Sequence, residues 1–188
     1  MTMSEMPKEE KARATLRQIT EADAAGYRAC LDRVAAERRY LAFTAAPPLQ
    51  EVKFYIMAML QRGLPFVVAV DAEGQVVGWC NIHVLPQTEH RVGFSHVGTV
   101  GMGLDAAWRG RGLGREMLQS VFDTAGRVGI ERVELQVYAS NESAVKLYRK
   151  FGFVTEGIKS RARKIDGQYD DIIMMARLRP PQSSGGAR

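Results

Sequence analysis

The pattern of hydrophobic and polar positions changes twice along the chain. After a short strand pattern at Thr15–Ile19, apolar residues recur at helical spacing and predict two helices, one from Thr20 to about Arg38 and one that ends at Gly63. Dense apolar and β-branched runs then predict strands, and from residue 112 onward helices and strands alternate. The later predicted elements are the strands Phe66–Val70, Val76–Leu85 and Phe94–Leu104, a helix near Gly112–Val128, the strand Arg132–Tyr138, the helix Asn141–Lys150, and a hairpin of Phe153–Lys164 and Tyr169–Leu178 joined by the turn Asp166-Gly167.

This order of elements predicts an α/β (α+β) domain, with a mixed central sheet and helices on its faces. Residues 13–179 are expected to form that single domain, between a flexible N-terminal segment at 1–12 and a flexible tail at 180–188. Gly98, Gly101 and Gly103 interrupt one predicted strand, and glycines within a strand often indicate a bulge or the close approach of another backbone.

The composition is typical of one soluble domain with a hydrophobic core. The chain has 188 residues, of which 46% are apolar and 25% charged. Its longest apolar runs have five residues, whereas a membrane-spanning helix needs about 20, so we expect no membrane association. Residues 1–13 are polar and lack the apolar stretch expected of a secretory signal, and Cys30 and Cys80 form neither a disulfide framework nor a metal-binding spacing. These features favour a cytoplasmic protein without a structural metal site.

The net charge of +5 suits an anionic partner, either a nucleic acid or a phosphate-bearing cofactor. Arg109, Arg111 and Arg115 lie within seven residues with no acidic residue among them. The basic residues concentrate at this loop rather than along a helix or an aromatic strand face, so nucleic acid is the less favoured partner.

The segment Arg109–Gly114 (RGRGLG) lies between a predicted strand and a predicted amphipathic helix. Its three alternating glycines allow the backbone to approach a ligand closely, and the start of the following helix adds its positive end, an arrangement that binds phosphate oxygens. The loop lacks the Lys-Ser/Thr of a Walker motif and the GxGxxG spacing of a dinucleotide fold. The alternative interpretation is a tight glycine turn with solvated arginines.

A second motif covers Asn141 to Tyr148. Asn141 is placed to cap a helix, and Tyr148, seven residues later, lies on the same helical face. A polar group and a phenol along one face can line a cleft. The alternative is a helix cap and a half-buried core tyrosine.

With both motifs present, the chain resembles the GNAT superfamily of N-acetyltransferases over nearly its full folded length. Arg109–Gly114 matches the family's [QR]xxGx[GA] signature, and Asn141, Ala144, Leu147-Tyr148 and Gly152-Phe153 match its later N…A…LY…GF signature. Within the family the chain looks like the branch of amino-acid, phosphinothricin and ribosomal-protein alanine acetyltransferases. The resemblance implies a mostly antiparallel sheet of about seven strands, in which two central strands splay apart.

The resemblance also implies transfer of an acetyl group from acetyl-CoA, the co-substrate, to a primary amine. Tyr148 would protonate the departing thiolate, and an amide near Met102–Leu104 would stabilise the charge on the thioester oxygen. The residues that would bind acetyl-CoA are Met102, Gly103, Leu104, Arg109, Gly110, Arg111, Gly112, Leu113, Gly114, Arg115 and Asn141.

The general base is not fixed by the resemblance. Some relatives carry a glutamate where this chain has Gln136, which cannot accept a proton, so His96, Glu134 and His83 remain as candidates. His96 can equally be a structural histidine.

The acceptor amine has four candidate contacts. Trp79 and His83 share a strand face with Asn81 and would line a pocket, and Glu37 and Tyr40 follow the first helix where the family's acceptor loop begins. The alternatives are an ordinary sheet face and a solvated helix end.

Four functions are consistent with these sequence features. The favoured one is an enzyme that acetylates a small-molecule amine, and the resemblance implies a homodimer, because many relatives are dimers. The others are a protein N-terminal or lysine acetyltransferase, a non-catalytic CoA-binding regulatory module, and a nucleic-acid binder.

Overall fold

Seven strands form one mixed sheet in the computed structural model, which describes residues 13–84 and 93–179. The strand order is β1-β2-β3-β4-β5-β7-β6, and within the described residues only β4 and β5 pair in parallel. The mixed, mostly antiparallel sheet is thus confirmed. The strands are β1 (Thr15–Gln18), β2 (Phe66–Val70), β3 (Val76–His83), β4 (Val97–Leu104), β5 (Arg132–Tyr138), β6 (Val154–Ile165) and β7 (Gln168–Leu178).

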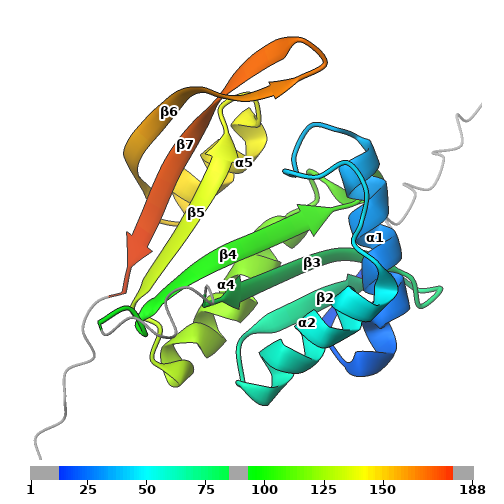
Figure 1. Ribbon diagram of the computed structural model, residues 1–188. Coiled ribbons are helices and arrows are strands. Elements are labelled where there is room, and N and C mark those ends of the chain that lie inside the picture. The colour runs from blue at the N-terminus through cyan, green and yellow to red at the C-terminus, as the bar shows by residue number, and fades with distance from the viewer. Residues whose placement is uncertain (1–12, 85–92, 180–188) are drawn as a thin grey trace, which may run out of the picture.

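Helices cover both faces of the sheet. In Figure 1, α1 (Ala24–Ala36) and α2 (Leu49–Gln61) lie in front of the sheet, whereas α4 (Leu113–Ala125) and α5 (Glu142–Lys150) lie behind it. Strand β2 is buried along its whole length because both of its faces are covered, which explains its unbroken apolar sequence. No helix in the described parts of the chain is both long enough and apolar enough to cross a membrane.

Several element boundaries differ from the predicted ones for local reasons. The first helix begins as a short 3-10 turn (Glu21–Asp23), where the backbone and side chain of Thr20 each donate to Asp23 at 2.8 Å. Strand β4 begins at Val97 rather than Phe94, because the chain turns there and the Val97 amide donates to the Phe94 carbonyl. Strand β3 ends at His83; the predicted end at Leu85 and the segments 1–12 and 180–188 lie outside the described residues.

Strands β4 and β5 pair over only three positions and then diverge. The last paired position joins Thr99 to Glu134. Beyond it, β4 stays paired with β3 as far as Leu104, and β5 stays paired with β7 as far as Tyr138. Each strand therefore has one backbone edge that faces the gap, as expected for the splayed pair.

The glycines of β4 accommodate side chains of the neighbouring strand, not another backbone or a bulge. A Cβ at Gly103 would lie 2.2 Å from the indole of Trp79, and one at Gly101 would lie 3.0 Å from Asn81 Oδ1. The two glycines thus allow the side chains of Trp79 and Asn81 to lie across β4, which brings β3 residues to the functional site.

Candidate active site

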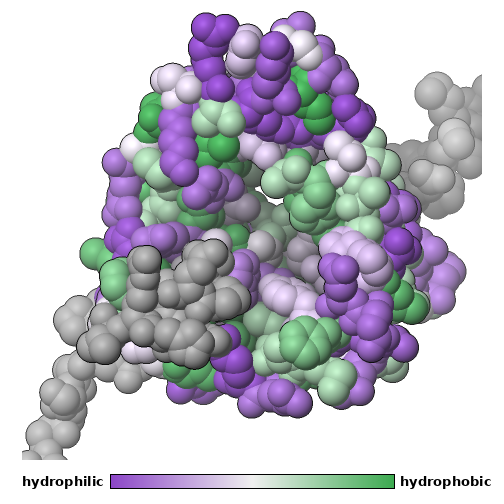
Figure 2. Space-filling model, viewed as in Figure 1, coloured by the Kyte–Doolittle hydropathy of each residue, from purple (hydrophilic) through white to green (hydrophobic). Residues whose placement is uncertain are grey.

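A cavity of about 600 Å³ opens where β4 and β5 diverge. The space-filling view shows the surface hollowed near its centre, between the β5–β7 part and the end of α1 (Figure 2). Eleven of the predicted site residues line this first cavity. They are Tyr40, Met102, Gly103, Leu104, Arg109, Gly110, Gly112, Gly114, Arg115, Asn141 and Tyr148.

The glycine-rich loop leads directly into α4, and the first backbone amides of that helix follow the loop. Gly110 (φ +70°) and Gly112 (φ +87°) both have left-handed backbone angles, which explains why glycine is needed there. The Gly112 carbonyl accepts from the amides of Arg115 at 2.9 Å and Glu116 at 3.2 Å, so α4 starts at this point. The amides of the first helical turn lack intrahelical acceptors and border the cavity, together with the positive end of the helix.

The side chain of Arg109 anchors this loop. Its guanidinium donates to both carboxylate oxygens of Glu37, at 2.8 and 2.5 Å, and to the Leu104 carbonyl at 2.7 and 3.0 Å. It also lies 4.7 Å from the ring centre of Tyr40. The hydrogen-bonded carboxylate raises the pKa of Arg109, so the charge is permanent. Arg109, which was predicted to bind the co-substrate, and Glu37, which was predicted to contact the acceptor, therefore form an ion pair with each other.

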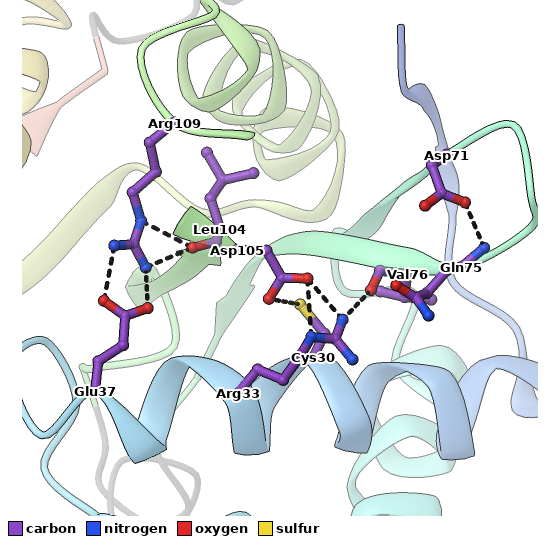
Figure 3. A network of polar contacts seen from close by, with 9 residues as sticks. All are labelled: Cys30, Arg33, Glu37, Asp71, Gln75, Val76, Leu104, Asp105 and Arg109. Atoms are coloured by element: carbon purple, nitrogen blue, oxygen red, sulfur yellow. Dashed lines mark hydrogen bonds and ion pairs between the residues drawn. The ribbon is translucent and has the colours of Figure 1, made fainter. Parts of the chain in front are cut away.

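A second ion pair ties the same region to α1. Arg33 donates to Asp105, directly after β4, at 3.0 and 2.6 Å, and to the Val76 carbonyl at 2.8 Å (Figure 3). Sequence reasoning missed this pair, because 72 residues separate its members and neither belongs to a motif. Arg33 lies in the last turn of α1 and Glu37 is the C-cap residue of the same helix, so one helix end holds both Asp105 and Arg109.

We expect Glu37→Gln to lower the free energy of unfolding by about 1 kcal/mol, because it removes the charge from a two-point, partly buried ion pair. Urea denaturation measures the change. Glu142→Gln is the matched control: its pair with Lys146 is highly exposed, and we expect a change below about 0.5 kcal/mol. Equal effects of the two substitutions would contradict the anchoring role of Glu37.

Asn141 and Tyr148 occupy one face of α5, as predicted. The Asn141 side chain caps the helix by accepting from the Ala144 amide at 3.3 Å. Tyr148 is buried and lines the cavity, and burial raises the pKa of its phenol well above the usual value. The phenol is therefore protonated at neutral pH, which is the state that a general acid requires.

A second cavity, of about 400 Å³, adjoins the first. Trp79, Asn81 and His83 of β3 line it, so the predicted strand face does form a pocket. Leu41, Gly101 and Met102 line both cavities, which places their junction at β4. Burial lowers the pKa of His83, so its imidazole is neutral at pH 7.

The structure does not bring the other two candidate bases to either cavity. His96 precedes β4, about 20 Å along the strand from Met102, and its carbonyl accepts from the amides of Glu131 and Arg132. Glu134 pairs with Arg132 at 2.7 Å, at the last position before the strands diverge.

Two of the predicted cofactor contacts direct their side chains elsewhere. The guanidinium of Arg111 lies 4.9 Å from the ring centre of Trp108, and the side chain of Leu113 is buried in the core. Neither residue lines the first cavity. Among the described residues, no group of three or more His, Cys, Asp or Glu side chains is arranged to hold a metal ion.

Comparisons with known proteins agree with this geometry. Residues 28–153 match the acetyltransferase (GNAT) family. The L-amino acid N-acetyltransferase AaaT of Escherichia coli is 31% identical over 108 residues, which are 57% of this chain and 64% of that protein. The alignment thus spans slightly less than two thirds of the relative.

Two solved structures share the fold. The acetyltransferase of GNAT family from Streptococcus pneumoniae superposes with a TM-score of 0.79 at 26% identity, covering 88% of this chain and 99% of the other. A GNAT superfamily phosphinothricin acetyltransferase from Sinorhizobium meliloti, in complex with AcCoA, gives 0.80 at 21% identity and covers 88% of each chain. With a family match over most of the domain, the splayed sheet and the amide-lined cavity, the chain belongs to the acetyltransferase (GNAT) family.

Proposed function

We propose that this protein transfers an acetyl group from acetyl-CoA to the primary amine of a small molecule. The observation that carries the proposal is the meeting of two cavities at Gly101 and Met102, one bordered by free helix-start amides and the other by polar and aromatic side chains. The first suits a phosphate-bearing co-substrate, and the second, at about 400 Å³, suits a small acceptor.

The residues of the first cavity fit acetyl-CoA, which supplies the acetyl group as an activated thioester. A diphosphate would be held by the amides of residues 112–114, beside the side chain of Arg115. The edge of β4 from Met102 to Leu104, which β5 leaves unpaired, offers backbone groups to the amides of the pantetheine arm. Asn141 lines the same wall.

The residues around the junction of the two cavities would supply the proton donor, the proton acceptor and the oxyanion contact that acetyl transfer requires. A β4 amide near Met102 would donate to the carbonyl oxygen, where negative charge develops. The amine nitrogen forms the new C–N bond while the C–S bond breaks, the amine proton passes to a base, and Tyr148 donates its proton to the sulfur. His83 is the base candidate that lines the acceptor cavity, and it is neutral at pH 7.

The alternatives have less support. A non-catalytic CoA-binding module would be expected to have lost the tyrosine or the glycine loop, and both are present. The relative named an L-amino acid N-acetyltransferase favours a small amine over a protein substrate.

The proposal is tested with a panel of amines in the presence of acetyl-CoA, with detection of free thiol. The panel contains amino acids, alkyl and aryl amines, polyamines, aminoglycosides, phosphinothricin and short peptides. We expect amine-dependent thiol release with at least one small amine and little with peptides. Acetyl-CoA binding without release by any amine would identify a binding module, and a preference for peptides would identify a protein acetyltransferase.

We also propose a cytoplasmic location and a homodimer. Cys30 and Cys80 are both buried and free, in keeping with a reducing compartment. The homodimer rests on the resemblance, and light scattering of the purified protein tests it.

A further inference from the structure

We propose that the acceptor cavity selects primary amines with an uncharged apolar substituent, such as arylalkyl or branched alkyl amines, over free amino acids. The inference rests on the proposed function, because it names the substrate class of the same reaction. Two features of the second cavity carry it: Glu51 is the charged residue of its described lining, and two buried polar atoms at its inner end have no hydrogen-bond partner among the described residues.

The walls of the second cavity are mainly aromatic and aliphatic. Helix α1 contributes Tyr27 and Leu31, helix α2 contributes Val52 and Tyr55, and Trp79 forms part of the floor. Tyr27 packs edge to face against Trp79, with ring centres 5.6 Å apart, so this wall is a preformed aromatic surface. Such a surface suits an aryl or branched alkyl group.

No lysine or arginine lines the second cavity within the described residues, where the charged lining residue is Glu51. The nearby guanidinium of Arg109 lines the first cavity and is already paired with Glu37. Among the described residues that line this cavity, the carboxylate of a free amino acid would therefore find no cationic partner, and Glu51 would repel it. Burial of an unpaired carboxylate is strongly unfavourable, whereas Glu51 attracts an incoming ammonium group.

The inner end of the cavity has two unpaired polar atoms. Asn81 is 3% exposed, and neither its Oδ1 nor the buried Nδ1 of His83 has a hydrogen-bond partner among the described residues. Asn81 Oδ1 lies 3.0 Å from the Cβ position of Gly101, a residue that lines both cavities. A buried acceptor without a partner is satisfied by an N–H donor. Asn81 Oδ1 would therefore accept a hydrogen bond from the substrate's amine, at the junction of the two cavities where the amine meets the acetyl group.

These two ends give the acceptor one orientation. The amine nitrogen lies at Asn81, beside the junction, and the substituent extends over Trp79 toward the mouth. The class differs from that named for the E. coli relative, whose amino-acid substrates carry a carboxylate. Glu51 is thereby a specificity residue, and Asn81 a substrate-binding residue.

The experiment compares matched pairs of acceptors. Phenethylamine and L-phenylalanine, and isoamylamine and L-leucine, are titrated by calorimetry into the protein saturated with CoA, and kcat/KM is measured with acetyl-CoA. We expect each amine to be favoured over its amino acid by about tenfold or more in both measurements. L-phenylalanine amide, which lacks the carboxylate charge, should recover most of the affinity.

Two variants connect the preference to the named residues. Asn81→Leu keeps a similar volume and removes the acceptor; we expect amine binding to fall about tenfold while acetyl-CoA affinity, the measure that the variant is folded, is maintained. Glu51→Arg, at an exposed position, should shift the preference toward the amino acids by supplying a cation.

The outcomes separate the inference from the proposed function. If acetyl-CoA binds and thiol is released, but amino acids equal or exceed the amines, the substrate class is wrong and the transferase stands. If neither member of either pair binds, the inference is likewise overturned. If acetyl-CoA itself does not bind, the proposed function fails.

Discussion

Replacement of Gly112 with Asp is expected to weaken acetyl-CoA binding by at least about 100-fold, because it places a carboxylate at the start of α4. Asp tolerates the left-handed backbone better than most residues, and a Cβ at Gly112 would meet its nearest neighbour, Glu116, only at 3.9 Å. The fold should therefore be retained. The new carboxylate would repel a diphosphate and would accept hydrogen bonds from the same amides. Each charge-assisted hydrogen bond that the diphosphate loses in this way is worth roughly one to a few kcal/mol.

Gly129→Asp is the matched control for this substitution. Gly129 also has a positive φ (+78°), a Cβ there would meet no atom within 4 Å, and it lines neither cavity. Calorimetry should show unchanged acetyl-CoA affinity for this control. If Gly112→Asp bound acetyl-CoA as tightly as the control, the amides at the start of α4 would not be the diphosphate site.

Tyr148→Phe should lower kcat by about 100-fold or more while acetyl-CoA affinity stays within about twofold, because general acid catalysis contributes roughly 10²–10⁴ in rate. The substitution removes one oxygen atom and leaves the ring packed edge to face on Phe153, 5.6 Å between ring centres. Steady-state thiol release gives kcat, and calorimetry gives the affinity.

Tyr138→Phe controls for the loss of a hydroxyl group from the same cavity, since Tyr138 also lines it. We expect less than a threefold change in kcat, because the Tyr138 phenol is not predicted to donate a proton to the departing sulfur. A turnover unaltered by Tyr148→Phe would remove Tyr148 as the acid and require another proton donor, such as water, for the sulfur.

The local parts of the site were predictable from the sequence, because they depend on short spacings. The seven-residue interval from Asn141 to Tyr148 determines a shared helical face, and α5 presents both residues to the cavity. The turn at Asp166-Gly167 needs two positive φ angles, and the structure has +49° and +80° there. The divergence of β4 and β5, in contrast, was expected from the family resemblance and not from any residue pattern.

The rest of the site depends on contacts between distant segments. Strand parity correctly placed Trp79 and His83 on one face, but it could not show at which end of β4 a cavity opens, and His96 proved to be at the other end. The partner of Arg109 likewise lies 72 residues away, at Glu37. The loop motif and the family resemblance predicted that both residues contact ligands, whereas the structure pairs them with each other.

Helix α1 contacts both the acceptor cavity and the proposed co-substrate site. Its Tyr27 and Leu31 form a wall of the acceptor cavity, and two residues beyond Leu31, Arg33 holds Asp105 directly after β4, where the co-substrate binds in our proposal. A molecule that shifts this helix is therefore sensed at both places, and thermodynamic linkage makes the effect reciprocal: whatever factor the amine applies to the affinity for acetyl-CoA, acetyl-CoA applies to the affinity for the amine.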